Sequence, residues 1–130
     1  MSDHHERAML LFAQLASIAD RKQQSIGRDR FLVLTGIAAT CAGWPEVAAR
    51  CLEVITSASP QHIVGRYPSF AAALRDDEFM PYVRQVEKFC SAERAEHLLA
   101  EMRMSPPTID DEHSAGDVSL ELLDRLPPKV

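Results

Sequence analysis

The chain has 130 residues, of which 46% are hydrophobic and only 6% are aromatic. This length and apolar content suit one small globular domain whose core is mostly aliphatic. The formal net charge of −5 argues against a nucleic-acid partner, because a protein that binds the phosphate backbone needs a basic face.

No stretch approaches the roughly 18–20 consecutive apolar residues that cross a bilayer, so we expect no membrane partner. The first residues, MSDHHERAMLLF, have no basic region ahead of their apolar run and do not resemble a signal peptide. Cys41, Cys51 and Cys90 have no CxxC spacing, and we interpret them as buried free thiols. Together these features predict a cytoplasmic protein.

Apolar residues at steps of three and four predict a first helix, which ends in the polar run from Asp20. Asp3 and Glu6 fit a capping box at its start. Residues 25–27 are predicted to form the following turn. The charged residues 28–30 are predicted to be a solvated turn leading into the next helix.

Residues 29–42 are apolar almost all round, which predicts a central helix that is buried on every side. Gly43 ends this helix, and Pro45 starts a third helix that runs to about Ser57. Trp44 lies between them at the corner. The two helices are therefore predicted to form an antiparallel hairpin.

Further helical segments follow the hairpin. They are a single turn within residues 60–65, a short helix at 70–74 capped by Ser69, an apolar stripe at 79–90, and a helix at 92–102 capped by Ser91. The fold class is therefore all-α, a compact bundle of about five to six helices around the hairpin.

The last part of the chain differs in composition. Residues 105–130 hold six acidic and two basic residues, a net charge of −4. We predict an all-α domain at residues 1–104 followed by an acidic, flexible tail. The tail contains a short amphipathic patch at residues 118–126. Its leucines are the candidate partner-binding residues: Leu120, Leu122, Leu123 and Leu126.

An isolated helix as short as this patch is unstable in water, so an ordered patch must dock on something. It can enter a groove of a partner protein, or a groove of the body, where it would mask a site. Alternatively, it packs permanently on the body as a last helix. The sequence leaves these arrangements open.

Small residues in the hairpin fall at fixed spacings: Gly36, Gly43, Ala48 and Pro60. At these positions the hairpin resembles one tetratricopeptide-type (TPR-like) repeat, although Thr35 and Ala39 depart from that pattern and no second repeat follows. The resemblance implies a helix-hairpin packing geometry and a peptide- or protein-binding role. The segments HIVGRYP and ERAEHLL resemble those of small bacterial helical proteins to which no activity is attached.

The best polar constellation lies where the chain leaves the hairpin. His62 and Arg66 are four residues apart and would share one face of a helical turn, with Tyr67 beside them. These three side chains could bind a carboxylate or a phosphate. Alternatively, they bond to helix ends and loop carbonyls and hold the crossing in place.

No catalytic, metal or cofactor motif is recognised. His97 lacks the glutamate three residues earlier that a di-iron helix would need, because Arg94 stands there. The function most favoured is a protein–protein interaction or adaptor module that binds a protein partner or self-associates. The alternative is a small-ligand (anion) binding or enzymatic domain that uses His62, Arg66 and Tyr67.

Overall fold

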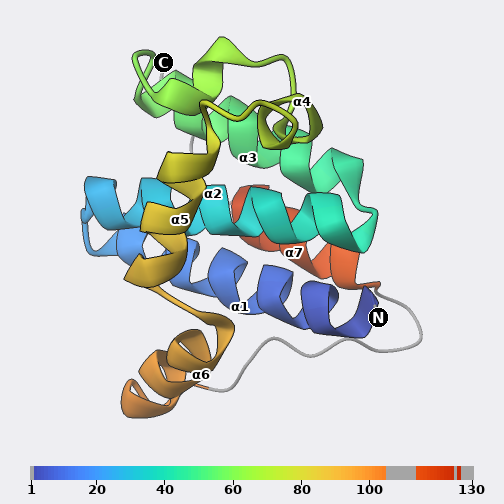
Figure 1. The fold of residues 1–130 in the computed structure, drawn as a ribbon. Helices are drawn as coiled ribbons and strands as arrows, with labels where there is room; N and C mark the ends of the chain where they lie inside the picture. The colour runs from blue at the N-terminus through green and yellow to red at the C-terminus, as the bar shows by residue number, and fades with distance from the viewer. Residues whose placement is uncertain (1, 105–113, 125, 127–130) are drawn as a thin grey trace.

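The predicted all-α class is confirmed by a computed structural model, which describes residues 2–104, 114–124 and 126 (Figure 1). Within these residues every regular element is a helix. In chain order they are α1 (Ser2–Arg21), α2 (Ser25–Ala42), α3 (Pro45–Ala58), the 3₁₀ helix η1 (Ile63–Arg66), α4 (Phe70–Leu74), α5 (Met80–Phe89), α6 (Ala92–Glu101) and α7 (Ala115–Asp124).

Helix α2 lies at the centre of the fold, between α1 and α3, and contacts both (Figure 1). Every residue from Phe31 to Gly36 is buried, which agrees with the apolar sequence of this stretch. Gly43 ends the helix with a φ of 83°, a conformation that glycine adopts without steric cost. Pro45 then begins α3. Gly43 and Pro45 therefore determine where the chain turns between α2 and α3.

The start of α2 differs from the prediction. The structure has no turn at residues 25–27, because α2 already begins at Ser25. The reversal lies at residues 22–24, where Gln23 adopts a φ of 60°. Gly27 is tolerated inside the first turn of the helix, and a Cβ added to it would meet no atom within 4 Å.

The prediction that residues 28–30 are solvated is also wrong. Asp29 is only 7% exposed, and the side chain of Arg28 is 15% exposed. A charged side chain is seldom buried without a partner, and each of these two has a partner outside α2: Asp20 for Arg28 and Ser59 for Asp29. Neighbouring residues in the sequence cannot reveal such partners.

Short helices close one side of the bundle. Ser69 and Ser91 cap α4 and α6 through their hydroxyl oxygens, as predicted. Gly36 of α2 lies directly beneath Phe70 of α4, and a Cβ at Gly36 would stand 2.4 Å from a ring carbon. The closest approach at this glycine is therefore to α4.

The N-terminal capping box is only partly visible. The side chain of Asp3 lies outside the described residues. Glu6 accepts a hydrogen bond from the indole nitrogen of Trp44, with 2.7 Å between Nε1 and Oε2. This contact ties the start of α1 to the corner between α2 and α3.

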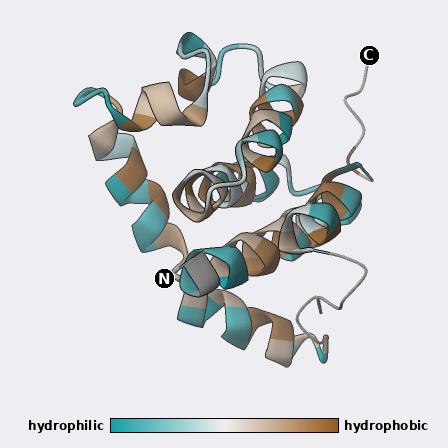
Figure 2. Cartoon of the chain, turned by 90° about the vertical axis from the view of Figure 1, so that its right-hand side faces the viewer, coloured by the Kyte–Doolittle hydropathy of each residue, from teal (hydrophilic) through white to brown (hydrophobic). Residues whose placement is uncertain are grey.

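Helices α6 and α7 cover different parts of α1. In both views α6 lies on the outer side of α1 (Figures 1 and 2). Its buried residues are Ala95 and Leu99. Helix α7 packs on α1 and α3, where Gly116 faces the ring of Trp44. Of the arrangements considered for residues 118–126, the structure has a helix packed on the body. Residues 105–113 of the predicted flexible segment lie outside the described residues.

The three cysteines do not share one environment. Cys51 and Cys90 are buried, as predicted, whereas Cys41 is exposed near the end of α2, so that prediction is wrong for Cys41. Burial raises the pKa of the Cys51 thiol and raises that of Cys90 to about 11. These two thiols are therefore protonated and unreactive near neutral pH.

Candidate functional site

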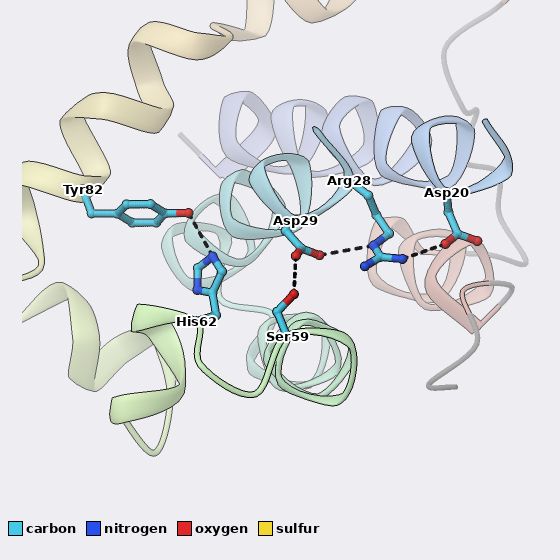
Figure 3. Close-up of polar contacts among 6 residues, drawn as sticks. All are labelled: Asp20, Arg28, Asp29, Ser59, His62 and Tyr82. Carbon is cyan, nitrogen blue, oxygen red and sulfur yellow. Dashed lines mark hydrogen bonds and ion pairs between the residues drawn. The ribbon is translucent and has the colours of Figure 1, made fainter. Parts of the chain in front are cut away.

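A row of polar contacts joins the start of α2 to the ends of α1 and α3 (Figure 3). Arg28 bridges two carboxylates, with Nη1 3.0 Å from Asp20 Oδ1 and Nε 3.2 Å from Asp29 Oδ1. The second oxygen of Asp29 accepts a hydrogen bond from the Ser59 hydroxyl at 2.8 Å. Because all three charged side chains are largely shielded from water, these contacts fix the relative positions of the three helices.

His62 lies beside this row and pairs with Tyr82 of α5 (Figure 3). Its Nδ1 accepts the backbone N–H of Val64 at 3.1 Å and thereby caps η1. In the neutral imidazole the proton must then be on Nε2, which donates to the Tyr82 hydroxyl oxygen at 3.0 Å. Both ring nitrogens are engaged.

The electrostatics of this pair keep both groups neutral near pH 7. Burial lowers the pKa of His62, while the negative charge of Asp29 opposes that change. Burial also raises the pKa of Tyr82. Because the lone pair of the neutral imidazole already holds η1, His62 is suited to fixing this crossing of the chain and not to accepting a proton from a substrate.

The other two residues of the predicted constellation have different surroundings. The ring of Tyr67 lies 5.4 Å from that of Phe79, and burial, followed by a hydrogen bond with Asp76, raises its pKa. Arg66 is exposed. Among the described residues, no hydrogen bond joins His62 to either of them. Anion binding by the three together stays a prediction. The contacts of His62 and Tyr67 with neighbouring residues account for the positions of these two side chains.

The predicted partner-binding leucines lie on α7 and just beyond it. Leu123 and Leu126 are at most 1% exposed and belong to the core. Leu120 and Leu122 are partly buried and pack against that core. A partner could reach Leu123 and Leu126 only if α7 left the body. The role of the four leucines in partner binding therefore stays a prediction.

An apolar groove that the sequence did not predict runs between α1 and α6. Two adjoining pockets of about 530 and 430 Å³ share Ile18, Lys22 and Met102, and we call them together the α1–α6 groove. The remaining apolar side chains along it come from α1, α2, α5, α6 and the residues after α6: Leu15, Ala19, Phe31, Phe89, Leu98 and Met104. Most of these residues fall in stripes that predicted core positions.

Phe89 marks the open side of this groove. It is 38% exposed, and its ring lies 5.2 Å from that of Phe31. The signal in the sequence was the apolar stripe of residues 79–90, which continues to the last residue of α5. The stripe predicts a buried face but not how much of that face a neighbouring helix covers.

A further pocket, of about 350 Å³, lies between α1, α2 and the junction of α5 with α6. His5, Cys41 and Cys90 are among its lining residues, on a floor that is mostly apolar. Nowhere in the described part of the chain do three or more His, Cys, Asp or Glu side chains gather as a metal ion requires. The pocket therefore offers no metal centre built from those residues.

Comparison of the chain with protein-family models, with curated proteins and with solved structures finds no match. Among the described helices none combines the length and apolar character that a membrane span requires. A function for this fold must therefore be argued from the groove and the polar contacts themselves.

Proposed function

We propose that this chain is a protein–protein interaction module, which binds a protein partner or a second copy of itself through the α1–α6 groove. The observation that carries the proposal is an open apolar groove whose edge includes the exposed ring of Phe89. Contiguous apolar surface of this kind on a soluble domain marks interaction sites. The proposal includes an adaptor role in the cytoplasm of a bacterial cell.

The composition of the groove suits a helical ligand. Apolar side chains from several helices line a concavity, which is how amphipathic helices are received. Met102 and Met104 bring flexible, polarisable side chains that can adapt to different apolar residues. The resemblance of α2 and α3 to a TPR-like hairpin supports the same role, because such hairpins serve as scaffolds for peptide-binding surfaces.

The wall formed by α6 is lightly attached, so the width of the groove can adjust. Only Ala95 and Leu99 of this helix are buried. Its ion pair with α1, between Arg7 and Glu96 at 2.8 Å, is exposed, and pairs of that kind contribute little to stability. A ligand can therefore be accommodated by a small displacement of α6.

Site-specific cross-linking in the native cell tests the proposal. A photo-reactive phenylalanine analogue replaces Phe89 in the full chain, and a matched chain carries it in place of Arg75, which is exposed on α4's C-terminal side. We expect a covalent adduct of defined mass from position 89 only. The adduct should disappear when Met102→Glu is added. Adducts of equal yield from both positions, or none from position 89, would contradict the proposal.

A further inference from the structure

We infer that the occupant of the α1–α6 groove is an acidic amphipathic helix from a partner protein. The inference rests on the proposed function and names the chemistry of the partner. Three observations carry it: the charge of the rim, the absence of ion pairs for that charge within the described residues, and the apolar side chains beneath it.

The rim of the groove is basic in a chain that is acidic as a whole. Arg21, Lys22 and Arg30 contribute three positive charges to the lining of the groove. Glu101 is the single carboxylate among these lining residues, and it lies 2.7 Å from Nε2 of His97. Since the net charge of the chain is −5, composition alone does not account for this local excess of cations.

The three cations of the rim have no carboxylate partner in the part of the chain that the structure describes. Within the described residues none of the three forms an ion pair. Lys22 Nζ lies 3.9 Å from the sulfur of Met102, and the Arg30 guanidinium lies 5.0 Å from the centre of the Phe89 ring. The charged ends of Lys22 and Arg30 thus lie next to apolar side chains that a ligand would cover. Short side-chain rotations would bring these two charges to carboxylates at the edge of the ligand.

The apolar floor decides which anionic partner fits. A nucleic acid would satisfy the cations through its phosphates but would leave the partly exposed side chains of Phe89, Leu98 and Met102 without an apolar partner. A helix with leucines on one face and glutamates beside them satisfies both requirements at once. Electrostatic complementarity would then contribute chiefly to specificity and to the rate of association.

Fluorescence anisotropy with two model peptides tests the inference. Both peptides have about 18 residues, or five helical turns, with leucines on one face. One carries glutamates at its remaining positions, and the other carries lysines. We expect the full chain to bind the acidic peptide at least about tenfold more tightly than the basic peptide, with weakening at higher salt.

Charge reversal provides the matched control. Lys22→Glu combined with Arg30→Glu should remove the preference for the acidic peptide, while Arg75→Glu, on another part of the surface, should leave it unchanged. Met102→Glu should abolish binding of both peptides. Equal affinity for the two peptides, or equal losses in the groove and Arg75 variants, would overturn the inference.

The outcomes also separate this inference from the proposed function. If neither peptide binds while cross-linking from position 89 still gives an adduct with a different protein, the acidic-helix inference is wrong and the interaction module stands. If the adduct is a second copy of the chain and light scattering shows a dimer that Met102→Glu dissociates, the occupant is that copy, and the inference is again wrong. Failure of cross-linking from position 89 removes both.

Discussion

Ser119 and Ser59 are two serines removed from bulk water whose hydroxyl groups have opposite hydrogen-bonding situations. Ser119 is 0% exposed, and its Oγ has no hydrogen-bond partner among the described residues. Ser59 is partly buried and donates to Asp29. An unsatisfied buried hydroxyl destabilises the folded state, whereas a hydroxyl bonded to a shielded carboxylate stabilises it. The two positions therefore differ in the sign of their contribution.

We predict that Ser119→Ala raises the free energy of unfolding by about 1 kcal/mol, because it removes an unsatisfied polar atom and adds no volume. Ser59→Ala should lower it by about 1–3 kcal/mol, because Asp29 loses a donor. Urea unfolding followed by the fluorescence of Trp44, the single tryptophan, measures both. A loss of stability in the Ser119 variant would mean that its hydroxyl is bonded in solution.

His62 should make stability depend on pH. Its pKa is lowered in the folded protein, so the unfolded chain binds the proton more tightly. The stabilisation that neutral His62 gives the folded state is therefore complete above the pKa of the unfolded chain, about 6.5. It is lost as the pH falls from there through the lower pKa of the folded protein. Protonation of Nδ1 also places a hydrogen against the N–H of Val64.

The variant His62→Asn isolates this effect, because asparagine can cap η1 through its side-chain oxygen and does not titrate. We expect the free energy of unfolding to fall more steeply between pH 7.5 and pH 5 in the parent chain than in the variant. The difference between the two profiles removes the contribution of the other histidines. Parallel profiles would show that His62 does not carry the pH dependence.

At the scale of single elements, α7 is held by close contact as well as by leucines. A Cβ added to Gly116 would lie 2.3 Å from a ring carbon of Trp44, and the indole is itself bonded to Glu6. The ring therefore has little freedom to retreat. Glycine inside a helix is ordinarily unfavourable, so its presence here reflects the approach of α7 to the corner between α2 and α3.

We predict that Gly116→Ala destabilises the chain by about 1–3 kcal/mol through overpacking, although alanine favours the helix by about 1 kcal/mol. Gly27→Ala is the matched control, since a Cβ there meets nothing within 4 Å. That variant should raise stability by up to about 1 kcal/mol. Thermal unfolding of both variants measures the difference, and a gain in the Gly116 variant would show that α7 can shift away from Trp44.

At the scale of the whole molecule, the structural features that depend only on residues close in the sequence could be predicted from it. Gly43 and Pro45 act within a few residues of themselves, so the corner between α2 and α3 follows from local rules. The burial of Asp29 depends on Arg28 beside it and on Ser59, 30 positions away, and no local pattern shows that pairing. The long-range partner explains why a charged turn was predicted where a helix begins.

The candidate site shows the same division between local and long-range effects. His62 and Arg66 were predicted to share one face of a helical turn, but the structure has a 3₁₀ helix there, with His62 as its N-cap in an extended conformation. Partners such as Tyr82, 20 positions away, determine where His62 points. The apolar stripes that end in Phe89 and Met102 were visible in the sequence. How far Phe89 and Met102 are exposed depends on where α6 packs. Its main contact is with α1, and that arrangement is a property of the tertiary structure.

The extent of the folding unit is the last prediction, since the composition placed a domain boundary at residue 104. In the structure Leu123 and Leu126 are fully buried, and each is worth about 1.5–3 kcal/mol relative to an exposed leucine. We therefore expect a chain of residues 1–104 to lose several kcal/mol of stability. The full-length variant Leu123→Ala with Leu126→Ala should show a similar loss, and it retains the linker and the charges of the tail.

Trp44 allows this prediction to be followed directly, because its ring faces Gly116 of α7. In residues 1–104 the indole loses that cover, so its emission should shift to longer wavelength. A synthetic peptide of residues 114–130 added in excess should reverse the shift and raise the unfolding midpoint, whereas the same peptide with aspartate at positions 123 and 126 should do neither. If residues 1–104 unfold at the same urea concentration as the full chain, the boundary lies at residue 104 and α7 contributes no stability.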